Sequence, residues 1–182
     1  MPGLFGCSQE GNDIYSIYAT YTPGGSGEPT YKTVGTTGVY PGFDSDPNRH
    51  AQPFTMPETG TIKSVSMYHY TDVGDTSMIL GVYSDNAGKP GDLLAKTDVT
   101  GVCNTTGWQT IELTSTPHVD GGTKIWLAWV YESSPGFRMR GGLPGEAYRS
   151  DETWNGGSMP NPFGDSTKTN VVFSIFANYT VD

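Results

Sequence analysis

Short apolar runs separated by turn-forming residues extend along the chain from about residue 60 to the C-terminus. Within the runs, large apolar side chains recur at every second position or fill both sets of positions, which is the spacing of β-strands. The segments between them are rich in Gly, Pro, Asn, Asp and Ser, which favour turns. The pattern predicts strands at Thr61–Tyr70, Ser77–Asp85, Gly107–Thr114, Thr123–Glu132 and Asn170–Thr180.

Alternation also predicts which side chains share a face of a sheet. The run Thr123–Glu132 is apolar on both faces, and so is Ser77–Asp85, as expected of central strands. The two faces of Thr123–Glu132 are Ile125, Leu127, Trp129 and Tyr131 on one side, and Trp126, Ala128 and Val130 on the other. In Thr61–Tyr70, strict alternation places Ile62 on the face opposite Val65 and Met67.

Three other segments have weaker patterns. Asp92–Asp98 fits either a short strand or a turn of helix capped by Asp92. The sequence Asp85–Gly88 is typical of a β-turn. The long segment Pro135–Ser166 is expected to be mostly loop.

Composition supports the same fold class. The 182 residues include 25 Gly and 13 Pro, and periodic helical stretches are missing. A chain of this length can bury a substantial core. We therefore predict an all-β protein built as a two-sheet antiparallel β-sandwich, a jelly roll with an N-terminal extension strand.

One strand pattern occurs twice, once near each end of the chain. Phe5–Thr22 aligns without a gap to Phe163–Thr180, with nine of eighteen positions identical and three more exchanged only between Ile and Val or Tyr and Phe. A Gly/Pro/Ser linker at 23–30 separates the first copy from the sandwich domain predicted at 31–182. The first copy, residues 1–22, is therefore a candidate donor strand or the end of a preceding module.

Three accounts fit this repeat: a tandem array, two pseudo-symmetric strands in one sheet, or docking of the first copy into a neighbouring subunit. Burying a large apolar side chain is worth about 1.5–3 kcal/mol, and an unpaired strand leaves its amides without partners. Strand addition to a sheet edge satisfies both needs and propagates into a filament when repeated head to tail. The candidate assembly residues are Ile14, Tyr15, Ile17, Tyr18 and Tyr21.

The runs GTIKSVSMYHY, LGVYSDNAGKPGDLLAKT, GWQTIEL and GGTKIWLAWVYE together resemble a known type of module. They are similar to the carbohydrate-binding-module-like jelly-roll domains found in tandem in bacterial and archaeal surface proteins and in some phage virion proteins. The resemblance covers roughly Gly60–Thr180, and Gly81–Leu94 carries its best signature. It implies glycan binding, adhesion or assembly without deciding between them.

Charge limits the partners. The net charge of −9 repels phosphate backbones and anionic lipid, so we expect neither nucleic acid nor a membrane surface as partner. No apolar run is long enough to span a membrane, and no signal peptide follows Met1. Copies of the chain, a neighbouring module, or glycans are the expected partners. The expected location is extracellular, at a cell surface, or in a virion.

Catalytic motifs are missing, and we expect no enzyme. The sequence contains neither GxSxG nor HExxH, and its histidines, His50, His69 and His118, lack ligand spacing. Two cysteines, Cys7 and Cys103, allow either one disulfide or two unpaired thiols. The sequons at Asn104 and Asn178 are acceptors only where glycosylation machinery is present.

A calcium site is the one cofactor hypothesis. Asp44, Asp46 and Asn48 stand at alternating positions, and oxygen ligands in such loops suit Ca²⁺. Asp72 and Asp75 are placed to complete such a site from the next loop. The alternative is a pair of solvated acidic turns.

A sugar platform is the candidate for ligand binding. Trp154 is surrounded by small and polar residues, and an exposed indole can stack on a sugar ring. Tyr148, Arg149, Asp151 and Asn155 would hydrogen-bond its hydroxyl groups. Alternatively, Trp154 anchors its own loop or lies in a subunit contact. Trp108 begins a strand after Gly107 and fits a core position.

Overall fold

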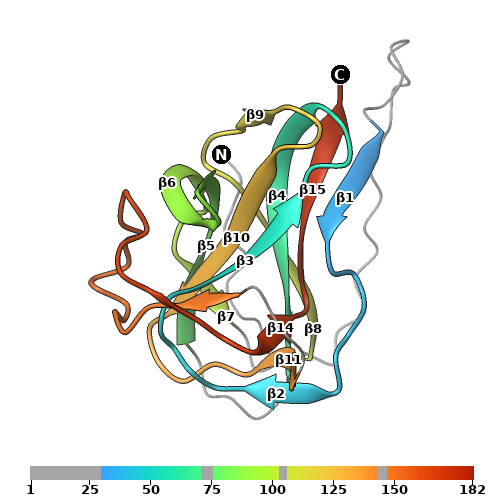
Figure 1. Ribbon diagram of the computed structural model, residues 1–182. Helices are drawn as coiled ribbons and strands as arrows, with labels where there is room; N and C mark the ends of the chain where they lie inside the picture. The colour runs from blue at the N-terminus through green and yellow to red at the C-terminus, as the bar shows by residue number, and fades with distance from the viewer. Residues whose placement is uncertain (1–29, 71–75, 103–105, 143–146) are drawn as a thin grey trace, which may run out of the picture.

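Two antiparallel sheets pack face to face in the computed structural model, which describes residues 30–70, 76–102, 106–142 and 147–182 (Figure 1). The all-β, two-sheet sandwich prediction is confirmed, and no helix occurs in these four ranges. The first copy of the repeated strand, residues 1–22, lies outside the described residues, as does the linker apart from Thr30. The domain itself begins with a strand at Tyr31.

Sheet A pairs the first described strand with the C-terminal strand. Its order is β1-β15-β4-β11-β14, with β2 attached to β11, and β8 and β9 attached to β4. Its strands are β1 (Tyr31–Gly35), β2 (Gly42–Asp44), β4 (Gly60–His69), β8 (Gly107–Glu112), β9 (His118–Val119), β11 (Phe137–Gly141), β14 (Val171–Phe173) and β15 (Ile175–Val181). The C-terminal strand β15 thus lies between β1 and β4.

Sheet B has the order β13-β12-β3-β10-β5-β6, with β7 attached to β5. Its strands are β3 (His50–Thr55), β5 (Thr76–Asn86), β6 (Lys89–Lys96), β7 (Thr100–Val102), β10 (Lys124–Tyr131), β12 (Tyr148–Arg149) and β13 (Thr167–Lys168). Asp92–Asp98 is therefore mainly strand, which settles the choice left open by its sequence. The β5–β6 connection is a tight turn in which Ala87 and Gly88 both have positive φ, 51° and 82°, as a type I′ hairpin requires.

The space between the sheets is filled by one apolar cluster, here called the core cluster. Ile125, Leu127 and Trp129 contribute from β10, as alternation predicted. Aromatic rings form its centre: Trp129 and Phe173 lie 4.6 Å apart between centroids. Tyr131 and Phe137 stack at 5.5 Å.

A second cluster, the outer cluster, covers the opposite face of sheet B. Trp126, Ala128 and Val130 point to it from β10, and Ile79 and Tyr83 from β5. Both central strands are therefore buried on both faces, which confirms the prediction from their unbroken apolar pattern. The indole N–H of Trp126 donates to a carboxylate oxygen of Asp85 at 2.9 Å.

A β-bulge in β4 changes which of its side chains face the core from those that strict alternation predicted. The register with β15 pairs Asn178 with Ser64 and Tyr179 with Ile62, so Lys63 has no direct partner. An extra residue reverses the alternation beyond it. As a result Ile62 points into the core cluster together with Val65 and Met67, rather than away from them.

Because the His69 side chain is buried, we predict that the folded protein loses stability at acid pH. The Nε2 of His69 shares a hydrogen bond of 2.9 Å with the Tyr131 hydroxyl, and burial lowers the pKa of His69 to about 4. Below pH 6.5 the unfolded chain takes up a proton that the folded chain resists. This contribution to stability is complete above pH 6.5 and is lost as pH falls to about 4, amounting to about 3 kcal/mol.

We expect His69→Gln, whose amide can hydrogen-bond the Tyr131 hydroxyl in either direction but does not titrate, to remove this dependence. Its stability deficit relative to wild type should shrink by about 3 kcal/mol between pH 7 and pH 4, measured by urea unfolding. His118→Gln, at an exposed position, is the matched control and should keep the wild-type slope. A deficit that stays constant with pH would contradict the assignment.

Candidate functional site

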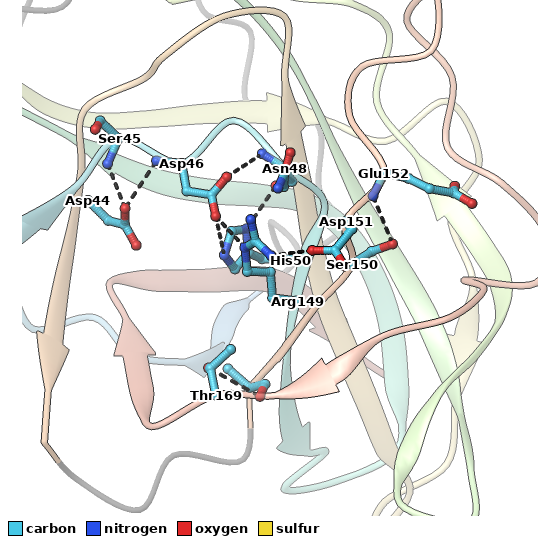
Figure 2. Close-up of polar contacts among 11 residues, drawn as sticks. Asp44, Ser45, Asp46, Asn48, His50, Arg149, Ser150, Asp151, Glu152 and Thr169 are labelled. Carbon is cyan, nitrogen blue, oxygen red and sulfur yellow. Dashed lines mark hydrogen bonds and ion pairs between the residues drawn. The ribbon is translucent and has the colours of Figure 1, made fainter.

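Three residues predicted from sequence as ligand groups lie together where β12 is beside the β2–β3 loop (Figure 2). They are Asp46, Arg149 and Asp151. The Arg149 guanidinium bridges two carboxylates: its Nε donates to Asp46, and its Nη1 donates to Asp151 at 2.5 Å. The hydrogen bond with Asp46 is the main reason that the pKa of Arg149 is raised. These three side chains therefore form one ion cluster in which a single cation is shared by two carboxylates, with a net charge of −1.

The Asp46 carboxylate is held in its ionised form. Burial opposes ionisation, but hydrogen bonds from Arg149 and from the Asn48 amide outweigh it, so the pKa of Asp46 lies below its usual value. His50 lies next to it, with its Nε2 3.9 Å from Asp46. Burial lowers the pKa of His50, and its Nδ1–H donates to the Asn48 carbonyl at 2.8 Å. The imidazole also stacks on Trp129, with centroids 5.3 Å apart.

The predicted calcium loop is organised by its own backbone. One oxygen of Asp44 accepts the amides of Ser45 and Asp46, and Asp46 accepts that of Asn48. Asp72 and Asp75 lie outside the described residues. Among the residues that are described, no group of three or more His, Cys, Asp or Glu side chains is placed to hold a metal ion. Calcium binding stays a prediction.

The predicted sugar platform is divided between two environments. Tyr148 contacts Trp126 edge to face at 5.4 Å, and Trp154 packs partly buried against the outer cluster. Asn155 is exposed, at a positive φ of 32°. Arg149 and Asp151 are bonded to each other. The structure thus brings Arg149 and Asp151 together, whereas the Trp154 ring packs on the outer cluster of sheet B. Glycan binding by this set stays a prediction.

A buried arginine that the sequence gave no reason to single out holds the covering loop in place. Arg49 is 2% exposed, and its guanidinium donates to Glu152 at 3.0 Å, to Ser150 at 3.2 Å and to the Phe163 carbonyl. The same group lies over the Phe163 ring, 4.7 Å from the centroid. Together these contacts fasten both ends of the loop at 150–163 to the start of β3.

Three aromatic side chains lie on the outer face of sheet A, away from the core. Phe176 on β15, Tyr68 on β4 and Trp108 on β8 occupy adjacent strands. The Trp108 ring contacts Tyr68 at 5.3 Å and Phe176 at 4.7 Å. Trp108 belongs to neither apolar cluster, so its expected core position is wrong. The sequence did contain a signal of this. Trp108 alternates with Gln109 and Ile111 in β8, so it lies on the face opposite Ile111, which packs against the core cluster.

The second copy of the repeated strand is now placed. Its inward side chains Phe173, Ile175, Ala177 and Tyr179 are at most 1% exposed, and all belong to the core cluster. The assembly residues predicted in the first copy, Ile14, Tyr15, Ile17, Tyr18 and Tyr21, lie outside the described residues. Cys7 and Cys103 do as well, so their pairing stays open.

No family model and no curated protein matches the chain. Among solved structures, it is similar to the cysteine protease and lectin-like domains of Cwp84, a surface layer associated protein of Clostridium difficile, at 15% identity and a TM-score of 0.45. The match covers 74% of this chain and 32% of that one, so the chain spans about a third of that structure. Within the described ranges no helix has the length and apolarity to cross a bilayer.

The contacts of Arg49 give a stability prediction. Arg49→Met keeps much of the apolar stem but leaves the Ser150 hydroxyl and the Phe163 carbonyl without their donor. Hydrogen bonds to charged groups contribute about 1.5–3 kcal/mol, so we expect a loss of about 2–4 kcal/mol in urea unfolding. Protease cleavage within 150–163 should become faster.

Arg140→Met is the matched control, because Arg140 is exposed at the end of β11. It should change stability by less than about 0.5 kcal/mol. Equal effects of the two substitutions would show that the Arg49 contacts do not hold the loop.

Proposed function

We propose that the chain is a non-catalytic structural module of an extracellular filament, surface array or virion. In this proposal it joins its neighbours by β-strand addition, through the strand pattern in residues 1–22. The supporting observation is the burial of β15, whose pattern the first copy repeats. The first copy has Tyr15, Ile17, Ala19 and Tyr21 where the second copy has Phe173 at the end of β14 and Ile175, Ala177 and Tyr179 in β15.

The match concerns the positions that matter for packing. Three of the four inward residues are identical, and the fourth exchanges Phe for Tyr. Because β15 pairs with β4 on one side and β1 on the other, a strand in its place needs the correct inward side chains and both hydrogen-bond ladders. The first copy therefore has the inward side chains of a strand that packs as β15 does, but the β15 position of a complete sandwich is already filled by that sandwich's own strand.

A second feature supports strand addition at an edge. Within the described residues, β1 pairs only with β15, so its other edge has unpaired backbone groups. Tyr31 on this strand is 60% exposed. A strand arriving from another molecule can bind there without displacing any strand of the sandwich.

Deleting residues 1–22 should convert assemblies into the monomer. We expect the full chain to show multiples of 19.6 kDa in size-exclusion chromatography with light scattering, increasing with concentration. The deletion variant should run as one monomer peak and keep its near-ultraviolet circular dichroism. A monodisperse full chain, or a distribution that the deletion leaves unchanged, would refute assembly through this segment.

Two single substitutions make the test sharper. Ile17→Lys changes a residue whose counterpart, Ile175, is fully buried, and it should weaken association at least about tenfold. Thr20→Lys adds the same charge at the position of Asn178, which faces outward, and should leave association close to wild type. Equal effects would exclude a strand that packs as β15 does.

A further inference from the structure

Strand β1 has a free edge on the side away from β15 (Figure 1), where no described strand pairs with it. Thr36, just after β1, donates its amide to the Ile175 carbonyl at 2.8 Å. Hydrogen-bonded pairs in an antiparallel ladder recur at every second residue, so the backbone groups of Lys32 and Val34 also point to β15. The backbone groups of Thr33, between them, point to the free edge.

The usual protection of an edge strand is weak at β1. Edges are commonly guarded by proline, by a bulge or by an inward-pointing charge. Strand β1 contains no proline, and its register with β15 is continuous. Its one charged side chain, Lys32, is compensated by Glu58 at 2.6 Å. Tyr31 and Thr33 are exposed, so their backbone groups on this edge can pair with an added strand.

The repeat within the chain gives a register for such a strand. In the observed pairing of β15 with β1, Thr180 lies opposite Tyr31. Because the two copies align without a gap, the same register places Thr22 opposite Tyr31, and Thr20 opposite Thr33. The first copy lies outside the described residues, so this register comes from the alignment and from the described edge of β1.

The linker has the length and composition of a hairpin connection in this register. With Thr22 opposite Tyr31, the eight residues at 23–30 join the two strands, and they are Pro, Gly, Ser, Glu and Thr. Connections in compact domains rarely exceed about 12–15 residues. A short flexible tether gives an effective concentration on the order of millimolar. At micromolar protein concentration, the edge of the same molecule is therefore favoured over that of another.

The side chains of the first copy suit this place beside β1. In this register Ala19 lies opposite Val34, whose side chain points into the core cluster. Ile17 and Tyr21 share that face with Ala19, because alternate residues of a strand face the same way. Phe54 on β3, the strand of sheet B that contacts β1, packs against the core cluster but is only partly buried. The added strand thus extends the apolar layer beyond β1.

We propose that the free edge of β1 binds the first copy of the same chain as an antiparallel hairpin closed by the linker, in the register of β15 with β1. The first copy then covers the edge at which a neighbour's strand would be added. Association requires this hairpin to open, after which the first copy pairs with β1 of another molecule through the same contacts. This regulatory consequence rests on the proposed function, whereas the pairing within one chain does not.

Hydrogen exchange measured by NMR tests the pairing on the full chain and on the chain without residues 1–22. At concentrations where light scattering shows a monomer, we expect the Tyr31 and Thr33 amides to exchange at least about tenfold faster after the deletion. The Lys32 and Val34 amides point to β15, so they are internal controls and should change by less than about twofold. Equal exchange of Thr33 in the two proteins would overturn the proposal.

An engineered disulfide tests the register. In a background with Cys7→Ser and Cys103→Ser, the pair Thr20→Cys and Thr33→Cys places two thiols directly opposite each other. The pair Ser16→Cys and Thr33→Cys is the matched control, because a displacement of four residues is about 13 Å and a disulfide joins Cα atoms less than about 7 Å apart. In an unpaired tether the two loops differ in closure probability by only about 1.5-fold.

The pairing predicts that the in-register pair oxidises at least about tenfold faster than the control pair, and that the product is a monomer in non-reducing electrophoresis. Similar rates for the two pairs, or crosslinked dimers at the same dilution, would contradict a hairpin within one chain.

Mixing chains that carry only Thr20→Cys with chains that carry only Thr33→Cys separates the two proposals. Crosslinked dimers that form only at high concentration support exchange of the first copy between molecules. A monomeric crosslink in the double variant, with no association of the full chain at any concentration, leaves the hairpin in place and refutes assembly. Dimers without a monomeric crosslink support assembly and refute the hairpin.

Discussion

The structure depends on covering a sheet that is apolar on both faces. Strands β5 and β10 direct large side chains both toward the core cluster and toward the outer cluster. Leaving the outer residues in water would cost about 1.5–3 kcal/mol for each large side chain. The loop at 150–163 provides the cover, and Arg49 fastens it through the Phe163 carbonyl and ring. The buried Arg49 guanidinium thus holds in place the loop that covers the apolar outer face of sheet B.

This constraint divides the surface of the sandwich. The long loop packs on sheet B, where Trp154 lies against the outer cluster and Arg149 forms ion pairs with Asp46 and Asp151. Sheet A has no equivalent apolar outer layer among the described residues, and its outward positions are polar or aromatic.

The sequence predicted the fold well where a local rule decides the outcome, and poorly where distant contacts do. Alternation placed both faces of β10 correctly, because no bulge interrupts that strand. It misplaced Ile62, because the bulge at Lys63 is visible only in the register with β15. It expected Trp108 in the core, since hydrophobicity does not say which side of an edge strand faces inward. Arg49 was missed because its partners lie about a hundred residues away.

Strand β15 connects the core, the outer face and the proposed joint between neighbours. Its inward residues fill the core cluster, and on the outer face Phe176 contacts the Trp108 ring and Asn178 donates to the Ser64 hydroxyl. The first copy has Tyr18 and Thr20 at the positions of these two residues. Tyr18 keeps an aromatic ring and Thr20 exchanges the amide for a hydroxyl, so the first copy repeats the character of β15 at its outward positions as well as at its inward ones. A strand that matches β15 on both faces has the side chains needed to lie in a sheet with one face against a core and the other toward solvent.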